Sequence, residues 1–350
     1  ETLRTQPSED VAFLSYATSA VFSPLPYVVP AIFAAATVAS GAGFLPALWI
    51  SRTANLLLGC FLIWLAIRKA RELTELLVLL GLLPMFLFLR SSVSADLLTI
   101  SASWLFVSIV IDEFASDREN TWQKAACAAL LIFTKPLFLL VTLLGLVRPL
   151  TRQQWRSALL VGASIVVSGL IAAQITASAL MPIRSDVATD PQGQMTRTIR
   201  ESPEVVSLIV RHAITSAPRY AVEAIGRLGW LDTPVPGPAT VLIAALLLIA
   251  SVTARSAEWL TLRLRMILLL VGLAGFFAVL WSNFVLWTPV PAVDIEGAQG
   301  RHFLPLAPLF LIPVMGLAET GTRWRTILVW LGMFFSCAIT IWVIVDRYWL

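Results

Sequence analysis

Three ionisable residues lie inside or at the edge of long apolar runs of this sequence, at Arg52, Asp96 and Lys135. Because a charged side chain in such a run is costly to bury, each marks a candidate functional site. Asp96 follows Ser94-Ala95 at the start of its run, where its carboxylate could bind a sugar hydroxyl or a divalent metal such as Mg²⁺ or Mn²⁺. Arg52 and Lys135 could each bind a phosphate, Arg52 through two parallel hydrogen bonds.

The same three residues also have purely structural interpretations. An acidic residue in the first turn of a helix, such as Asp96, is favoured by the helix dipole. Arg52 and Lys135 could extend their charged ends to water while their methylene groups cover apolar surface. The sequence leaves both interpretations open.

A dense polar segment precedes a late apolar run. It contains Gln299, Arg301 and His302, and an arginine at a membrane surface suits a lipid phosphate. A second polar and aromatic turn contains Trp230 and Asp232. The alternatives are an ordinary solvated loop for the first segment and an interfacial aromatic residue for the second.

The elements that position these residues follow from the composition. The chain has 350 residues, of which 58% are hydrophobic and 13% are charged, against about 25% charged in a soluble domain. We therefore expect an all-α polytopic membrane protein, because a spanning helix needs about 20 apolar residues. About eight full spans are predicted, at 48–67, 73–89, 93–111, 156–180, 238–254, 265–287, 303–318 and 326–345.

The net charge of +4 does not indicate a nucleic-acid partner. The basic residues form short clusters between apolar runs. The sequence contains no long basic patch with interleaved aromatic residues, which is typical of nucleic-acid binding. Such clusters are typical of cytoplasmic loops, and membrane lipid is the partner that they predict. The three cysteines lie inside apolar runs without metal-ligand spacing, which indicates packing residues.

One apolar segment, 122–148, cannot be a simple span if the basic clusters all face the cytoplasm. Pro136 follows Lys135 in its middle, and proline breaks a helix. We expect a re-entrant pair of half-length helices, with one kinked helix as the alternative. Broken backbone at membrane depth is tolerated where protein buries it or where it lines a cavity.

The chain is predicted to form one transmembrane domain over 1–350, with a long extracytoplasmic loop at 181–237. Within this loop, Ser202-Pro203-Glu204 is typical of a helix start, and apolar residues follow at helical spacing. This pattern predicts an amphipathic helix that lies on the membrane or caps a cavity. Residues 27–46 favour a shorter interfacial helix.

An ordered series of short motifs runs along the chain. The motifs are Ser23-Pro24-Leu25-Pro26-Tyr27-Val28-Val29-Pro30-Ala31, Ser51-Arg52-Thr53-Ala54-Asn55-Leu56, Leu83-Pro84-Met85, Ser92-Val93-Ser94-Ala95-Asp96, Thr134-Lys135-Pro136, Gly229-Trp230-Leu231-Asp232-Thr233 and Gln299-Gly300-Arg301-His302-Phe303-Leu304-Pro305. This series resembles the bacterial membrane family called domain of unknown function 2142 (DUF2142), and the resemblance covers nearly the whole chain. His302 departs from the tyrosine that the family pattern implies.

The family is in turn similar to the C-type (GT-C) glycosyltransferases, which use lipid-phosphate-linked sugar donors on the non-cytoplasmic face. The resemblance implies that Asp96 lies near the donor or a metal and that Arg301 holds the lipid phosphate. It also implies a first span and an outer loop with the catalytic base, which we expect to precede this chain.

The predicted function is therefore transfer of a sugar from a polyprenyl-phosphate donor to a glycan or lipid of the cell envelope, in a bacterial inner membrane. The catalytic residue is not identified. A transporter or flippase of a polyprenyl-linked glycan, and a non-catalytic membrane scaffold, are the alternatives. All three require a membrane protein, but the enzyme alone requires that the polar residues meet in one cavity at one membrane face.

Overall fold

The computed structural model describes residues 23–178, 189–229, 231–255, 258–291, 293–318 and 322–349. Its regular elements are almost all helical. They are α2 (Leu25–Ala39), α3 (Phe44–Lys69), η2 (Arg71–Leu73), α4 (Thr74–Gly81), α5 (Pro84–Arg90), α6 (Ala95–Ser116), α7 (Thr121–Thr134), η3 (Pro136–Phe138), α8 (Leu139–Thr142), α9 (Leu144–Thr151), α10 (Trp155–Ser178), α11 (Pro191–Arg200), α12 (Ser202–Gly226), β1 (Arg227–Leu228), β2 (Thr233–Pro234), α13 (Gly237–Val252), α14 (Leu262–Trp287), η4 (Gly300–Leu306), α15 (Ala307–Leu311), η5 (Ile312–Val314) and α16 (Thr322–Trp349).

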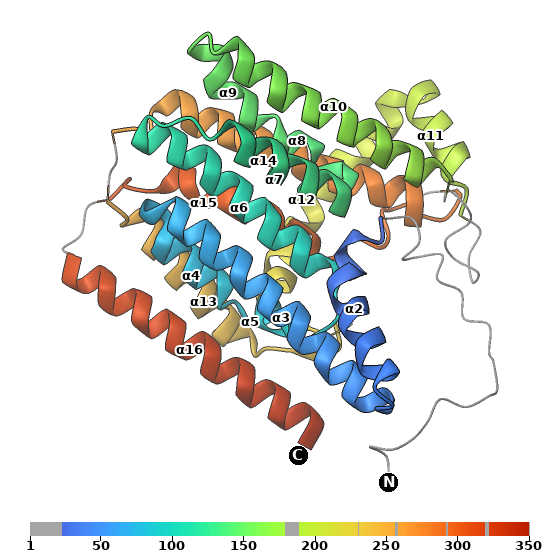
Figure 1. The fold of residues 1–350 in the computed structure, drawn as a ribbon, viewed down its shortest axis with the longest axis vertical. Helices are drawn as coiled ribbons and strands as arrows, with labels where there is room; N and C mark the ends of the chain where they lie inside the picture. The colour runs from blue at the N-terminus through green and yellow to red at the C-terminus, as the bar shows by residue number, and fades with distance from the viewer. Residues whose placement is uncertain are drawn as a thin grey trace.

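Within these ranges, five helices are long and apolar enough to cross a membrane, which makes the protein an all-α membrane protein. They are α3, α6, α10, α14 and α16, and they run along a common direction (Figure 1). The expectation of about eight full spans is therefore too high. Three of the apolar runs that were predicted to be full spans form shorter or broken elements instead.

The run at 73–89 is bent rather than straight. It forms α4 and α5, which meet at an angle of 82° around Pro84. Leu83 takes an extended conformation because a residue before proline is disfavoured in the helical region. Counting this bent pair as one broken span would raise the number of spans to six.

The runs at 303–318 and 238–254 also fall short of full spans. Pro305, Pro308 and Pro313 divide the first into η4, α15 and η5, because proline supplies no backbone N–H. The second is α13, whose 16 residues extend about 24 Å, less than the roughly 30 Å of a bilayer's hydrocarbon core.

The segment 122–148 turns back on itself, as its proline predicts. α7 ends at Thr134, and the following helices return along it to the end from which α7 started. On this return, the backbone oxygen of Gly145 accepts a hydrogen bond from Lys124 Nζ at 3.2 Å. The Arg148 guanidinium binds the backbone oxygen of Arg118, in the loop before α7, at 2.8 Å.

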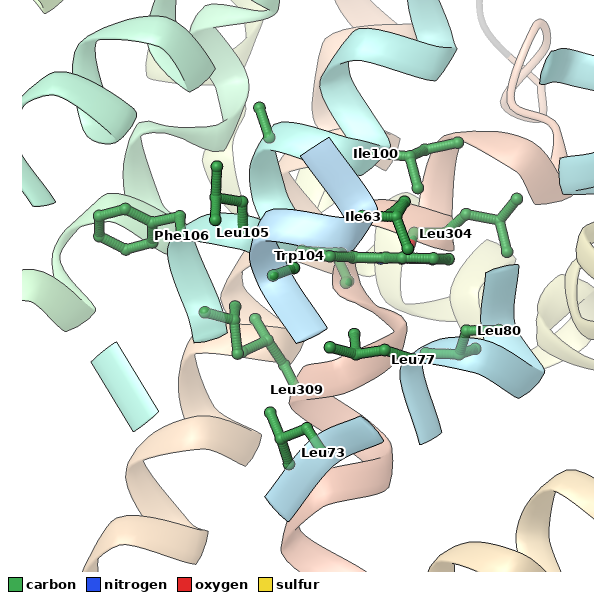
Figure 2. Packing of buried hydrophobic residues seen from close by; sticks show 14 of the residues in the cluster. Ile63, Leu73, Leu77, Leu80, Ile100, Trp104, Leu105, Phe106, Leu304 and Leu309 are labelled. Carbon is green, nitrogen blue, oxygen red and sulfur yellow. The ribbon is translucent and has the colours of Figure 1, made fainter. Parts of the chain in front are cut away.

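Helix α6 is the centre of the molecule. In its most apolar stretch 89% of the residues are buried, against 39% or fewer in the other four long helices. The fully buried Trp104 packs among Ile63, Leu77 and Leu304, which come from three other elements (Figure 2). The remaining long helices expose apolar side chains such as Leu170 and Phe334, as lipid-facing helices do.

The helix predicted to start at Ser202 is α12. Val205, Ile209 and Tyr220 on one side of it are buried, whereas Val206 is exposed. The buried side packs against η4 and α14. This contact gives α12 a role in supporting the segment that contains Arg301.

Candidate functional site

The carboxylate of Asp96 lies between two cations that come from distant parts of the chain. Its Oδ1 atom is 2.5 Å from Lys135 Nζ, and its Oδ2 atom is 3.2 Å from Arg301 Nε. All three side chains are largely buried. Three segments separated by up to 205 positions in the numbering thus meet at one carboxylate.

The position of Asp96 follows from the start of α6. Ser94 is the N-cap residue, and its hydroxyl accepts a hydrogen bond from the Asp96 backbone N–H at 3.2 Å. The loop before the cap is held by the buried Asn55, whose Nδ2 donates to the Ser92 backbone oxygen at 2.8 Å. The first turn of the central helix therefore presents the carboxylate from a fixed support.

The position of Lys135 follows from the break between α7 and η3. Pro136 occupies the first position of η3, and Lys135 before it is extended, with φ −150° and ψ 110°. This is the conformation that a following proline favours. The break turns the lysine side chain out of the helical path and toward Asp96.

The position of Arg301 depends on close packing of η4 against α12. A Cβ atom at Gly300 would lie 2.3 Å from the backbone nitrogen of Ala224 and 2.4 Å from the backbone oxygen of Tyr220. Only glycine fits at this contact. The Gly300 N–H donates to the buried Glu223 carboxylate at 2.8 Å.

The other end of η4 is held by α6 itself. Ser103 Oγ donates to the backbone oxygen of Pro305 at 2.7 Å, and Trp104 Nε1 donates to that of Leu304 at 2.9 Å. These bonds satisfy carbonyls that an irregular, proline-containing segment leaves without helical partners. The segment with Arg301 and the helix with Asp96 are thus joined directly.

The turn between β1 and β2 contributes a backbone atom to the site. Arg301 Nη1 donates to the backbone oxygen of Gly229 at 3.4 Å. Gly229 has φ +66°, which favours glycine, and a Cβ atom there would lie 2.3 Å from Asp232 Oδ1. The turn therefore holds the Arg301 guanidinium with a main-chain oxygen and not with a side chain.

A cavity of about 540 Å³ opens at this cluster. It has a charged and polar part and an apolar part, a combination that suits an amphipathic ligand. Its described polar lining includes Ser92, Ser94, Asp96, Lys135, Ser282, Asn283, Gln299, Arg301 and His302, and its apolar and aromatic lining includes Phe88, Leu137, Phe138, Val279, Leu286, Trp287 and Tyr27.

The electrostatics of the cavity favour an anion. Two cations, Lys135 and Arg301, face the single carboxylate of Asp96 among the lining residues described. Desolvation and the neighbouring Lys135 and Arg301, against the opposing effect of Asp96, lower the pKa of His302 to about 3. His302 is therefore neutral, and the described lining residues contribute two positive charges and one negative charge. Its Nδ1 accepts the backbone N–H of Gln299 at 3.4 Å.

The same geometry does not fit a divalent metal at Asp96. Each carboxylate oxygen already faces a cation, so that neither is available to a metal ion without displacement of Lys135 or Arg301. Over the part of the chain that the structure describes, no three His, Cys, Asp or Glu side chains are grouped as metal ligands. The expectation of Mg²⁺ or Mn²⁺ stays a prediction.

Five of the eight residues predicted for the site line this cavity, namely Asp96, Lys135, Gln299, Arg301 and His302. Two of the other three are not in its lining, and the third is Trp230. Arg52 is exposed on α3 and is not in the cavity lining. Asp232 is exposed and lies 3.7 Å from Arg347, and Trp230 lies outside the described residues.

Several lining residues were not among the candidates, Asn283, Trp287 and Tyr27 among them. Asn283 and Trp287 belong to α14, and Tyr27 belongs to α2. A lone amide within an apolar run is a signal that would have identified Asn283. Tyr27 and Trp287 carry no such signal, because aromatic residues are common at the ends of membrane helices.

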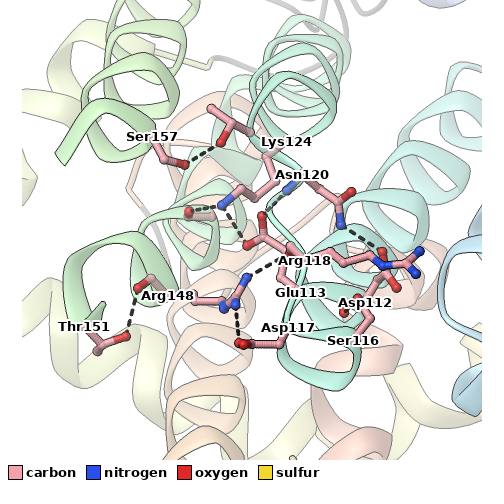
Figure 3. Close-up of polar contacts among 12 residues, drawn as sticks. Asp112, Glu113, Ser116, Asp117, Arg118, Asn120, Lys124, Arg148, Thr151 and Ser157 are labelled. Atoms are coloured by element: carbon pink, nitrogen blue, oxygen red, sulfur yellow. Dashed lines mark hydrogen bonds and ion pairs between the residues drawn. The ribbon is translucent and has the colours of Figure 1, made fainter. Parts of the chain in front are cut away.

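A second polar cluster occupies the opposite end of α6 (Figure 3). Glu113 and Lys124 form a buried ion pair with 2.8 Å between Oε2 and Nζ. Nearby, Arg148 Nη2 is 2.5 Å from Asp117, and Lys69 at the end of α3 donates to Asn120 at 3.3 Å. The basic clusters at 68–71 and 148–156 thus lie at the end of α6 away from the cavity.

Comparison with known proteins gives one match. The model of a family described as "Predicted membrane protein (DUF2142)" matches residues 4–310. This match covers most of the chain and confirms the resemblance that the ordered motifs indicate. No curated protein and no solved structure matches the chain.

Proposed function

Because this chain belongs to the DUF2142 family of predicted membrane proteins, we propose that its cavity binds the phosphate of a polyprenyl-phosphate-linked sugar and that the protein transfers this sugar to a glycan or lipid of the cell envelope. The observation that carries the proposal is the pairing of Asp96 with both Lys135 and Arg301 in one cavity. The cations that hold this carboxylate can also bind the oxygens of a phosphate.

The shape and charge of the cavity support a lipid rather than a free anion. Among the described lining residues, the two cations Lys135 and Arg301 face one carboxylate. Phe88, Leu137 and Phe138 line the same space with apolar surface, which suits the chain attached to the phosphate. A small inorganic anion would leave this apolar part unused.

The proposed reaction exchanges one bond at the anomeric carbon. An acceptor hydroxyl forms a new bond to this carbon as the bond to the phosphate oxygen breaks, and the electron pair leaves with the polyprenyl phosphate. Lys135 and Arg301 stabilise the charge that develops on that phosphate. The acceptor proton passes to a general base, which is not identified among the residues described.

The distribution of basic residues supports an active site on the non-cytoplasmic face of a bacterial inner membrane. The cavity lies at the N-terminal end of α6, whereas the clusters at 68–71 and 148–156 lie at its other end. Clusters of arginine and lysine beside spans mark the cytoplasmic side.

The test uses the full-length gene product in lipid nanodiscs. Decaprenyl phosphate should bind saturably, and Arg301→Gln and Lys135→Gln should each weaken its binding at least tenfold. Arg68→Gln is the matched control, because it removes one exposed cation at the other end of the molecule. Equal affinity in all four proteins would overturn the proposed binding site.

Sugar transfer is measured separately, with radiolabelled decaprenyl-phosphate-linked glucose or mannose and envelope material from the producing cells. Transfer that Arg301→Ala abolishes without loss of folding supports the enzyme. Movement of the intact donor across a vesicle membrane, without cleavage, would instead support the alternative of a transporter or flippase. Binding with neither activity would favour the non-catalytic scaffold.

A further inference from the structure

We propose that one face of α14, formed by Ser282, Asn283 and Trp287, is a subsite for the neutral sugar ring of the donor. This inference rests on the proposed function and extends it, since it assigns a second part of the ligand to a second wall of the cavity. The three residues line the cavity and carry no charge.

The face is defined by helical spacing. Asn283 and Trp287 are four positions apart, so that they lie one above the other on α14, and Ser282 lies beside Asn283. The side chains that this helix contributes to the cavity carry no charge. The wall therefore differs in chemistry from the Lys135–Asp96–Arg301 cluster, which comes from other elements.

The loop that leads into η4 holds this wall in place. Gly297 has φ +79°, and a Cβ atom there would lie 2.8 Å from Cβ and Cγ of Trp287 and 3.1 Å from Asn283 Oδ1. Only glycine allows so close an approach. The Glu296 N–H also donates to Thr288 Oγ1 at 3.2 Å, just after the end of α14.

The side chain of Asn283 is itself fixed in orientation. Its Nδ2 donates to the backbone oxygen of Val279 at 2.8 Å, one turn earlier in α14. Its Oδ1 consequently points away from that turn, toward the loop at Gly297. A fixed amide oxygen is a hydrogen-bond acceptor that can select a hydroxyl by position.

These residue types suit a hydroxylated ring better than an alkyl chain. An amide and a hydroxyl can bind the hydroxyl groups of a sugar, and an indole ring offers a broad apolar surface with one polar atom. Gln299, which also lines the cavity, adds a second amide. A wall meant for the polyprenyl chain would need no such groups, and burying them against it would be unfavourable.

The volume is consistent with this assignment. Pockets for small ligands span about 300–1,000 Å³, and this cavity has about 540 Å³. A phosphate bound at Lys135 and Arg301 fills only a small part of that space. The remainder is bounded on one side by the uncharged wall of α14.

The test compares three probes on the full-length protein in nanodiscs, namely decaprenyl phosphate and its conjugates with glucose and with mannose. At least one conjugate should bind about tenfold more tightly than decaprenyl phosphate, the gain that two net hydrogen bonds provide. Asn283→Ala and Ser282→Ala should reduce this gain and leave the affinity for decaprenyl phosphate within twofold of the wild type.

The outcomes separate the two proposals. Failure of decaprenyl phosphate to bind would overturn the proposed function. Binding of decaprenyl phosphate with no gain from either sugar would overturn the sugar subsite alone. A loss of affinity for both kinds of probe in Ser282→Ala, whose side chain is only half-buried, would show that the wall serves the phosphate or the fold and would likewise overturn the subsite.

Discussion

The carboxylate of Glu223 accepts a hydrogen bond from the backbone N–H of Gly300, the residue directly before Arg301, with 2.8 Å between Oε2 and the nitrogen. Glu223 is buried on α12, and its other oxygen lies 3.6 Å from Arg219. Helix α12 thus fixes the main chain from which the Arg301 side chain extends.

We expect Glu223→Ala to weaken the binding of decaprenyl phosphate by about tenfold, because it leaves the buried Gly300 N–H without its acceptor and loosens η4. Glu223→Gln keeps an oxygen at this position and should restore most of the affinity. Isothermal binding measurements in nanodiscs would check both variants. Equal losses in Glu223→Ala and Glu223→Gln would contradict a positioning role through this hydrogen bond.

Asp96→Asn should bind decaprenyl phosphate more tightly than the wild type, by roughly tenfold at low salt. In the wild type the carboxylate competes with the ligand for Lys135 and Arg301, and its removal makes the charge of the cavity more positive. The gain should shrink as ionic strength rises. Asp346→Asn, which removes an exposed carboxylate on α16, should leave this affinity unchanged. Weaker binding by Asp96→Asn would show that the carboxylate orients the two cations instead.

The loop before η4 should lose stability in acid through Asp294. Partial burial on its own would raise the pKa of Asp294, but hydrogen bonds from His212 and from the Ile295 N–H outweigh it and hold this pKa below its usual value. The stabilisation is therefore complete above the unfolded pKa of about 3.9 and is lost as pH falls through the lower folded value.

Since Asp294 is mostly exposed, the effect should be small, about 0.5 kcal/mol. The melting temperature of Asp294→Asn should lie slightly below that of the wild type at pH 6, and the two should converge toward pH 3. A difference that stays constant from pH 6 to pH 3 would rule out this contribution of the Asp294 carboxylate.

Removal of divalent metal should leave the binding of decaprenyl phosphate unchanged. Both oxygens of Asp96 face cationic side chains, which already supply the positive charge that a metal would bring. Titrations with and without EDTA would check this expectation. Loss of binding in EDTA that added Mg²⁺ or Mn²⁺ reverses would show that a metal displaces Lys135 or Arg301 from the carboxylate.

The sequence indicates the site best where local rules determine the geometry. A few consecutive residues are enough to predict the Ser94 cap before Asp96 and the Pro136 break after Lys135. In the structure Ser94 caps α6, and Lys135 takes the extended conformation that a following proline favours. The meeting of these residues with Arg301 depends on long-range packing. Resemblance to a family suggested it, but no spacing in the chain could establish it.

Other features depend on tertiary contacts that leave no local pattern. Glu223 and the backbone oxygen of Gly229 support Arg301 from positions more than 70 residues away. The count of spans fails for a related reason. Hydropathy sums over a run and does not register that Pro84 or Pro305 has divided it.

Helix α6 forms ion pairs at both of its ends. Asp96 in its first turn contacts Lys135 and Arg301, and Glu113 near its C-terminus contacts Lys124. These contacts join α6 to α7 and to η4. Separation of the buried Glu113–Lys124 pair would be strongly unfavourable, because it would leave both charges buried without a partner. We therefore expect α6, α7 and η4 to keep one arrangement with respect to each other.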